Sequence, residues 1–330
     1  MQIPPSFSIT PEMLDLVSEI DSYRHYFSAL EIPGQFKQKI ERVSSLKSSL
    51  YSARIEGNPL TMENFTQSSD TVRKLEIMNV SKALRFAQRG SIKGKKINLK
   101  LIQEIHRLIL TGLRPDAGRL RTEMSAIFNQ AGVAVYVPPN PKKVKEYLSE
   151  LISYLNKKEP FPLVKSFIGH LVFEKIHPFV DGNGRVGRIL ILSVLHQNEY
   201  GFGFSIPFAE FLDEHKEDYY YYLGVGMNQT NEYLFFMLRA FLSQLKKLKN
   251  EIKVRPVDNI ELLLPPRQEE MARIIKDHRA VSFEFIRRRF LNVPTRTLRY
   301  DLKQLADKKF IIKIGKTRGS YYRFRSNFSN

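Results

Sequence analysis

The 330-residue sequence contains no cysteine. Disulfides, thiolate catalysis and zinc sites built on cysteine are therefore excluded, and nothing indicates an oxidising compartment. Long hydrophobic runs are absent too, because the most apolar one, YLFFMLRAFL at residues 233–242, is too short to cross a bilayer and includes an arginine. The N-terminal residues lack the basic and apolar regions of a signal peptide. We expect a cytoplasmic protein that contacts no membrane.

Acidic side chains are outnumbered by basic ones, which gives a formal net charge of +18. An excess of this size indicates an anionic partner, and the charge alone leaves open whether that is nucleic acid, nucleotide phosphate or a membrane surface. The excess is concentrated in residues 267–330, where 17 Lys and Arg face 6 Asp and Glu. The C-terminal segment is therefore electrostatically distinct from the rest.

The chain is longer than a single hydrophobic core usually supports, so we expect a main domain and an appendage. Prolines at positions 256, 265 and 266 interrupt the helical pattern before the basic segment begins. We divide the chain into an N-terminal helical region at residues 1–90, a core at 91–245, a linker at 246–266 and a C-terminal domain at 267–330.

Apolar residues recur every three or four positions over most of the first two regions, which predicts a mainly α fold. Strand-like alternation is found mainly in MSAIFNQAGVAVYVPP, residues 124–139. Two short β-branched runs flank NQAG there, so we predict a hairpin that turns at residues 129–132. An ordinary surface hairpin would give the same pattern.

The segment HPFVDGNGRVGR, residues 177–188, lies between two apolar helices. His177 precedes Pro178, and a residue before proline avoids the α region, so the first helix should end at His177. Gly182, Asn183 and Gly184 can take positive φ and turn consecutive backbone N–H groups into an anion nest. The nest opens onto a helix N-terminus, which favours an anion as well.

Arg185 and Arg188 stand in the first turn of that second helix, where a cation is disfavoured by about 0.3–1 kcal/mol relative to an acid. Bound phosphate would turn this defect into an attraction. Asp181 suits a magnesium ion held by one carboxylate, phosphates and water. His177, with a reference pKa of about 6.5, is the obvious general base. Each fragment alone also fits a purely structural loop.

The segment resembles the defining motif of the Fic family, His-x-Phe-x-Asp/Glu-Gly-Asn-Gly-Arg-x-x-Arg, and matches it at every specified position. The resemblance extends more weakly from the first helices to about Phe241. It implies a Fic-type helical bundle with a β-hairpin flap at about 125–139. It also implies transfer of AMP from ATP to a Ser, Thr or Tyr hydroxyl of a protein, with Mg²⁺ as cofactor and pyrophosphate as product.

The resemblance assigns a role to each motif residue. His177 would deprotonate the target hydroxyl, Phe179 would anchor the loop in the core, and Asp181 would hold the metal. The residues that would bind ATP phosphates are Gly182, Asn183, Gly184, Arg185, Gly187 and Arg188. A kinase branch of the family carries lysine at the position of Gly184, so the glycine favours nucleotidyl transfer. Another branch uses a CDP adduct, which leaves the nucleotide open.

Two further segments resemble family features. Val133, Ala134, Val135 and Tyr136 would form the flap edge that aligns an extended target segment by strand addition. Tyr219 and Tyr220 occupy a position that packs on adenine in relatives, and core tyrosines at helical spacing are the alternative. The target can be the protein itself, and a homodimer is compatible with the resemblance.

SARIEGN, residues 52–58, has the features of an ordinary helix end, with glycine and then proline after the last turn. However, Glu56 at a helix C-terminus opposes the dipole, as the two arginines do at an N-terminus. The segment also resembles the inhibitory motif Ser/Thr-x-x-x-Glu-Gly/Asn through Ser52, Glu56 and Gly57. In relatives, this glutamate pairs with the second motif arginine and blocks productive binding of the γ-phosphate.

The order of elements predicted for residues 267–330 is helix, short helix, turn, helix and β-hairpin, the pattern of a small winged helix-turn-helix domain. This order and the positive charge suggest DNA binding, although many winged helices bind proteins. The residues we expect to face DNA are Thr295, Arg296, Thr297, Arg299, Tyr300, Lys303, Lys316 and Arg318.

The sequence thus favours a protein adenylyltransferase that Glu56 inhibits through Arg188. Three alternatives stay open. The chain could be a DNA-binding transcriptional regulator that senses a nucleotide with little turnover. It could remove AMP from a modified protein, with Glu56 directing water. It could also transfer a group from another nucleotide.

Overall fold

The structure is a computed structural model that describes residues 1–330 except 31–33, 89–94, 129–133, 254–263, 279, 308–309, 316–319 and 326–330. The chain divides into two compact units, which are considered separately. Unit 1 comprises Met1–Leu30 and Glu41–Leu248, and unit 2 comprises Glu31–Ile40 and Lys249–Asn330. The division falls within two helices, α2 and α10.

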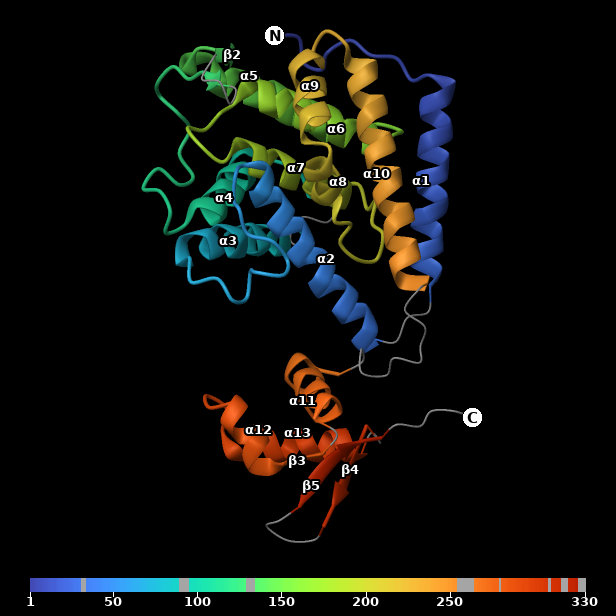
Figure 1. Cartoon of the computed structure of the whole chain (residues 1–330). Coiled ribbons are helices and arrows are strands. Elements are labelled where there is room, and N and C mark those ends of the chain that lie inside the picture. The colour runs from blue at the N-terminus through green and yellow to red at the C-terminus, as the bar shows by residue number, and fades with distance from the viewer. Residues whose placement is uncertain are drawn as a thin grey trace. The chain divides into compact units, whose positions relative to one another are not determined.

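The described residues form a mainly helical fold with small antiparallel sheets, as the sequence predicts (Figure 1). The first ten helices are α1 (Pro11–Ala29), α2 (Gly34–Ile55), α3 (Thr71–Gln88), α4 (Leu99–Leu110), α5 (Pro141–Asn156), α6 (Pro162–Ile176), α7 (Asn183–Gln197), α8 (Phe208–Glu214), α9 (Lys216–Val225) and α10 (Thr230–Lys253). Between α4 and α5 lie the strands β1 (Ile127–Phe128) and β2 (Ala134–Tyr136).

Local signals in the sequence set several of these helix starts. The side chains of Thr10, Asn98 and Asn140 each accept a hydrogen bond from a backbone N–H in the first turn of α1, α4 and α5. Proline then occupies the first turn of α1 and α5, where its missing N–H costs nothing. The polar cap and the apolar spacing therefore agree on where these helices begin.

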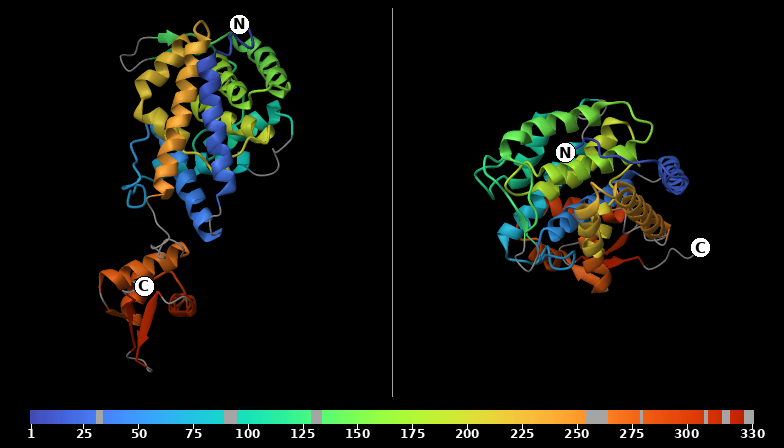
Figure 2. Two further views of the ribbon diagram at one scale, coloured as in Figure 1. Left: turned by 90° about the vertical axis from the view of Figure 1, so that its right-hand side faces the viewer. Right: turned by 90° about the horizontal axis from the view of Figure 1, so that it is seen from above.

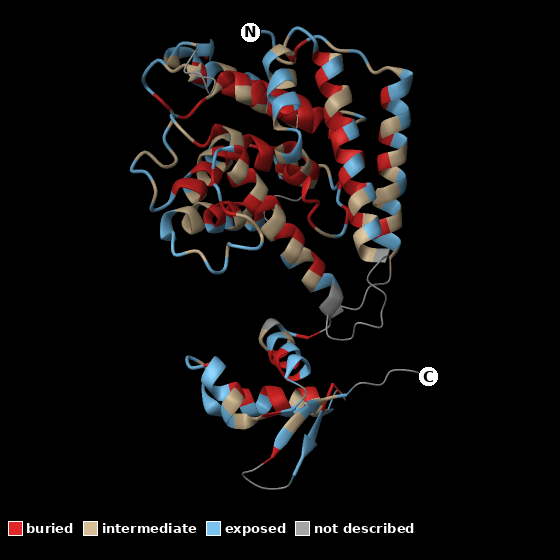
Figure 3. Cartoon of the chain, in the orientation of Figure 1, coloured by how far each residue is buried: buried red, intermediate tan, exposed pale blue. Residues whose placement is uncertain are grey.

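Helices α6 and α7 form the centre of unit 1 and are buried over most of their length (Figure 3). Only two of the fifteen residues of α6 escape full burial. The two helices pack so closely that a Cβ added at Gly187 of α7 would collide with Glu174 and His170 of α6. Because both helices are fixed by the core, the loop that joins them at residues 177–182 has a fixed entry and exit.

Helices α1 and α10 run side by side along one edge of unit 1 (Figures 1 and 2). Near one end of the pair, the Asn231 amide donates to the Ser8 hydroxyl at 2.9 Å, and towards the other end Lys246 pairs with Glu19 at 2.8 Å. The N-terminal residues are thus part of the same compact unit as α10. Residues 1–30 and 41–90 therefore lie in the same compact unit as the predicted core at 91–245.

Unit 2 contains α11 (Pro266–Asp277), β3 (Ala280–Ser282), α12 (Phe283–Arg289), α13 (Thr295–Asp307), β4 (Ile311–Ile314) and β5 (Tyr321–Phe324). The strands form an antiparallel sheet in the order β3-β5-β4. Residues of all three helices and of the sheet share one apolar core, which includes Met271, Ile286, Leu298 and Ile311. The predicted order of three helices and a hairpin is present, and β3 was not predicted because three residues carry too little periodic signal.

The predicted linker at 246–266 overlaps both neighbouring helices, because α10 continues to Lys253 and α11 starts at Pro266. Leucines and lysines at helical spacing prolong α10 past the predicted boundary. The predicted turn at 129–132 lies outside the described residues. No helix in the described ranges is long and apolar enough to cross a membrane.

Candidate active site

The loop from His177 to Gly182 joins α6 to α7. Helix α6 ends at Ile176, and the His177 N–H donates to the Phe173 carbonyl at 3.0 Å, so the predicted helix end is confirmed. His177 has φ 46° and ψ 62°, in the left-handed region that non-glycine residues rarely adopt. The constraint from Pro178 is therefore met by a left-handed residue rather than an extended one.

Phe179 anchors this loop in the core, in agreement with the role that the family resemblance implies. Its ring is fully buried and stacks on His106 of α4, with the centroids 3.7 Å apart. Its N–H donates to Asn183 Oδ1 at 2.9 Å, and its carbonyl accepts from Asn183 Nδ2 at 2.8 Å. The Asn183 amide therefore holds the loop, and only its backbone N–H remains for a phosphate.

His106 is a loop-positioning residue that the sequence reading missed. The Gly118 N–H donates to Nδ1 at 2.8 Å, and Nε2 lies 3.0 Å from the Asp181 carbonyl. Because Nδ1 accepts, Nε2 carries the proton and donates to Asp181. Burial lowers the pKa of His106 and favours this neutral form. A single histidine on an apolar helix gives no signal of such a role.

The predicted nest is a helix N-terminus, that of α7, rather than a run of left-handed residues. Gly182 takes φ 80°, whereas Asn183 and Gly184 are already helical, which corrects the predicted three-residue nest. No acidic residue lies in the first turn, and no side chain caps the helix. The unpaired backbone N–H groups and the dipole favour an anion here.

The two motif arginines, Arg185 and Arg188, pair with different side chains. Arg185 Nη2 pairs with Asp181 Oδ1 at 3.0 Å, and the buried Arg185 Nε has no hydrogen-bond partner within the described ranges. Asp181 Oδ1 also accepts from the Gly182 N–H, and the side chain remains 45% exposed. A half-exposed carboxylate beside an anion site fits the predicted magnesium ligand, which binds one protein carboxylate together with phosphates and water. The described residues contain no cluster of three or more acidic or histidine side chains that could bind a metal alone.

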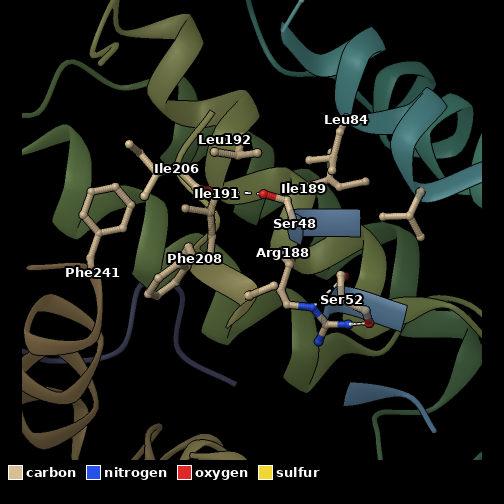
Figure 4. A pocket seen from close by; sticks show the side chains of 12 residues that line it. Ser48, Ser52, Leu84, Arg188, Ile189, Ile191, Leu192, Ile206, Phe208 and Phe241 are labelled. Atoms are coloured by element: carbon tan, nitrogen blue, oxygen red, sulfur yellow. Dashed lines mark hydrogen bonds between the residues drawn. The ribbon is translucent and has the colours of Figure 1, made fainter. Parts of the chain in front are cut away.

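Arg188 is held by the end of α2, the segment singled out as inhibitory. It donates to Ser52 Oγ at 3.0 Å, to the Ser52 carbonyl at 2.8 Å and to Glu56 Oε1 at 2.9 Å (Figure 4 shows the Ser52 contact). Gly57 follows with φ 95°, the helix-ending glycine that the sequence predicts. SARIEGN is thus both a helix end and a ligand of Arg188.

Glu56 also covers the N-terminus of α7. A Cβ added at Gly184 would collide with Glu56 Oε1. The carboxylate therefore lies against the first turn of α7, where the fold offers an anion site. Tertiary structure has brought together the misplaced acid of one helix and the misplaced arginine of another.

A small cavity lies on the other side of Arg188, between α2 and α7 (Figure 4). Its volume is about 30 Å³, and its lining is mostly apolar, with Ile189, Ile206 and Phe208 among the residues. It has room for about one water molecule. A nucleotide does not fit in this cavity.

The flap retains its predicted place. β1 and β2 pair antiparallel, with Ile127 opposite Tyr136. The Tyr136 hydroxyl donates to the Lys175 carbonyl at 2.8 Å, which ties β2 to the last turn of α6. Val135 points outward and is 58% exposed. Ala134 is exposed as well, whereas Val133 lies outside the described residues.

The nucleobase prediction is wrong for Tyr219. Its ring is fully buried, and its hydroxyl lies 2.8 Å from His170 Nε2, so the core interpretation holds. A run of four tyrosines, residues 219–222, gives no local sign of which one faces the site. Tyr220 is 45% exposed and donates to the Ile55 carbonyl at 3.1 Å, next to Glu56. Only Tyr220 remains available for a ligand.

In unit 2, α13 turns Leu298, Leu302 and Leu305 into the core. The predicted DNA-facing residues are exposed or half-exposed: Thr295, Arg296, Thr297, Arg299, Tyr300 and Lys303. Arg299 also lies over the Phe283 ring, 4.9 Å from its centroid. Lys316 and Arg318, predicted for the wing, lie outside the described residues.

Residues 96–195 match the sequence profile of the Fic/DOC family. The chain contains a Fic domain. Relatives named protein adenylyltransferase Fic are 29% identical over 243 residues in Nematostella vectensis and 27% identical over 221 residues in Aedes aegypti. These matches cover 69% and 63% of this chain, and 52% and 42% of the relatives. The chain thus spans about half the length of the curated relatives it matches.

Solved structures share the fold. A Fic family protein from Desulfovibrio desulfuricans G20 matches with a TM-score of 0.69 over 99% of both chains, at 21% identity. Fic-1 from C. elegans matches with a TM-score of 0.61 over 73% of each chain, also at 21% identity. The mainly helical architecture around the Fic motif is therefore the one these proteins have.

Next to the Fic motif lies a mostly buried acid that the sequence analysis missed, Glu174, whose side chain is 13% exposed. Glu174 Oε1 and His170 Nδ1 are 3.8 Å apart, and neither has a hydrogen-bond partner among the residues that the structure describes. Burial raises the pKa of Glu174 to about 8. The nearby Glu56 carboxylate also raises this pKa, whereas the Arg188 guanidinium lowers it. At neutral pH the Glu174 side chain is therefore mostly a neutral acid.

We predict that Glu174→Gln changes how stability depends on pH. In the unfolded chain Glu174 ionises near its ordinary pKa of 4.5, whereas in the folded chain it stays protonated to about pH 8. Its contribution to the free energy of unfolding therefore falls as the pH rises between these values. Urea unfolding at pH 5, 6, 7 and 8 should show that the free energy of unfolding of the variant, relative to wild type, increases as the pH rises. Glu150→Gln, on the exposed face of α5, is the control, and a constant difference at position 174 would contradict the prediction.

Proposed function

We propose that the chain is a protein adenylyltransferase that transfers AMP from ATP to a hydroxyl group of a protein. The observation that carries the proposal is the position of His177 in the loop that leads directly into the N-terminus of α7. That N-terminus combines free backbone N–H groups with Arg185 and Arg188. A histidine base beside a phosphate site is the arrangement that transfer to a hydroxyl requires.

His177 is prepared to accept a proton. Its Nδ1 lies 3.3 Å from the Glu174 carbonyl, which can only accept, so Nδ1 carries the hydrogen and Nε2 is the basic atom. Burial lowers the pKa of His177, while the Glu174 carbonyl and the Glu56 carboxylate act in the opposite direction. The neutral, proton-accepting form therefore predominates near pH 7.

The proposed step forms one bond to phosphorus and breaks another. The target hydroxyl oxygen bonds to the α-phosphorus of ATP, and its proton passes to His177 Nε2. The bond between the α-phosphorus and the bridging oxygen breaks, and pyrophosphate leaves. Arg185 and the N-terminus of α7 would stabilise negative charge on the phosphates. Asp181 would hold Mg²⁺, which when bound neutralises phosphate charge.

Glu56 would keep the enzyme inhibited. Its carboxylate takes one donor of Arg188 and covers Gly184, so it competes with phosphate for the same guanidinium and the same helix end. ATP would then bind in a poorly reactive pose, and automodification would be weak. The pair is anchored from α2, since Lys47 pairs with Glu210 at 3.3 Å and Arg54 pairs with Asp213 at 2.9 Å.

The basic tail favours a second role. We propose that unit 2 is a winged helix-turn-helix module whose α13 contacts DNA. The exposed side of α13, with Arg296 and Lys303, supports this, as does the charge of the segment. Protein docking through the same face is the alternative. If labelled ATP binds but no AMP is transferred, the chain is better explained as a nucleotide-sensing regulator. Loss of AMP from a modified target would instead indicate the reverse activity.

We predict that Glu56→Gly raises the rate of AMP transfer at least tenfold at neutral pH, because it removes the carboxylate that competes for Arg188. Transfer of labelled AMP from ATP to the protein itself, or to lysate proteins, measures the rate. Glu63→Gly, which removes an exposed acid just after the same segment, should behave as wild type. Equal rates for Glu56→Gly and wild type across ATP and Mg²⁺ concentrations would refute the inhibition.

His177→Ala in the Glu56→Gly background should lower transfer by about 10²–10⁴-fold, because it removes a general base. ATP affinity should stay within twofold, since the imidazole makes no phosphate contact. Calorimetric titration of ATP gives the affinity, and labelled AMP gives the rate. Retention of full activity would remove His177 from the mechanism.

For unit 2, Arg296→Ala and Lys303→Ala should each weaken binding to DNA and make its salt dependence shallower by about one unit of the log–log slope. Fluorescence anisotropy of a labelled duplex between 50 and 200 mM salt checks this. Lys142→Ala, an exposed lysine of α5, is the control. Salt-insensitive or absent binding by the full chain would favour protein docking instead.

A further inference from the structure

Arg121 is a buried arginine that neither the motif nor the proposed chemistry uses. It lies between α4 and the flap, and only 4% of its surface is exposed. No carboxylate pairs with it in the part of the chain that the structure describes. Burial of an unpaired cation is costly, and here burial lowers the pKa of Arg121. Backbone carbonyl oxygens accept hydrogen bonds from the guanidinium instead.

Two of these carbonyls belong to the end of α6 and the catalytic base. Arg121 Nε donates to the His177 carbonyl at 2.7 Å, and Nη2 lies 3.5 Å from the Ile176 carbonyl. The backbone N–H of Arg121 donates to the Pro178 carbonyl at 2.9 Å. Arg121 thus fixes the peptide groups around His177. It also places a cation at a helix C-terminus, which the dipole favours.

These contacts bear on the backbone of His177. A left-handed residue other than glycine is strained and persists only when its surroundings fix it. At His177 the constraint comes from Arg121 on the carbonyl side and from Phe173 on the N–H side. The direction of the imidazole depends on that backbone conformation.

The other two carbonyls belong to the flap. Nη1 donates to the Glu123 carbonyl at 3.0 Å, and Nη2 donates to the Pro139 carbonyl at 2.5 Å. Glu123 precedes β1 and Pro139 follows β2, so one guanidinium holds both ends of the flap. The Tyr136 hydroxyl, which donates to the Lys175 carbonyl, adds a second link between β2 and α6.

We infer that Arg121 is a positioning residue that sets the flap and the catalytic base in one fixed geometry. The inference rests on the proposed function, since the flap would align the target segment and His177 would take its proton. A planar guanidinium has five donors in a rigid fork, so it can reach carbonyls on opposite sides at once. A lysine ammonium carries the same charge but cannot span them.

The test uses the full chain in the Glu56→Gly background. Arg121→Lys keeps the charge, and Arg121→Gln removes it while keeping amide donors. Arg119→Lys, two residues away and exposed, is the matched control. Thermal unfolding identifies which variants are folded. We expect both Arg121 variants to lose kcat by about 100-fold, the cost of an ångström-scale displacement of a catalytic group, with ATP affinity within twofold. Arg119→Lys should match the background.

Hydrogen exchange gives a readout that does not depend on activity. In the Arg121 variants, amides of β2 and of residues 180–182 should exchange faster together, while those of α5 stay unchanged. Unaltered kcat, an ATP affinity that falls as much as kcat, or faster exchange throughout unit 1 would overturn the inference. If the Glu56→Gly background transfers no AMP, the proposed function fails. Hydrogen exchange alone then decides whether Arg121 couples the two segments.

Discussion

The N-terminus of α7 favours a bound anion, and many contacts of the site depend on this preference. Its first turns carry two arginines and no acid, against the helix dipole. In the structure, the Glu56 carboxylate at the end of α2 supplies negative charge to this helix end. In the proposed catalysis, a nucleotide phosphate would supply it. Because we propose that phosphate binds at the helix end that Glu56 covers, one electrostatic property of α7 links the proposed activity to its inhibition.

The C-terminus of α6 presents the complementary problem. Its last carbonyls lack helical partners, and Arg121 supplies a cation and the donors. His177 therefore lies between the N-terminus of α7, which favours an anion, and the C-terminus of α6, where Arg121 supplies a cation. His106 holds the Asp181 carbonyl from α4, and Glu174 lies where α6 meets Gly187 of α7. Because α6 and α7 pack closely, these contacts hold the loop between the two helices in one position.

Much of the architecture followed from local patterns. Helical spacing and the proline after His177 predicted the helices around the motif and the end of α6. The hairpin of the flap and the order of elements in unit 2 followed from alternation and turn residues. Weaker signals failed, as at the three-residue strand β3 and in α10, where helical spacing continues beyond the expected boundary.

The sequence by itself determined the chemistry available, since the spacing of His177, Asp181, Arg185 and Arg188 depends only on one loop and one helix turn. Tertiary structure decided which groups meet. It placed Glu56 on Arg188 across 132 residues of chain, buried Tyr219 while leaving Tyr220 exposed, and set Arg121 behind the base. The physical reason is that such contacts depend on how helices pack. Their interaction energies belong to residues far apart in sequence, and no local pattern records them.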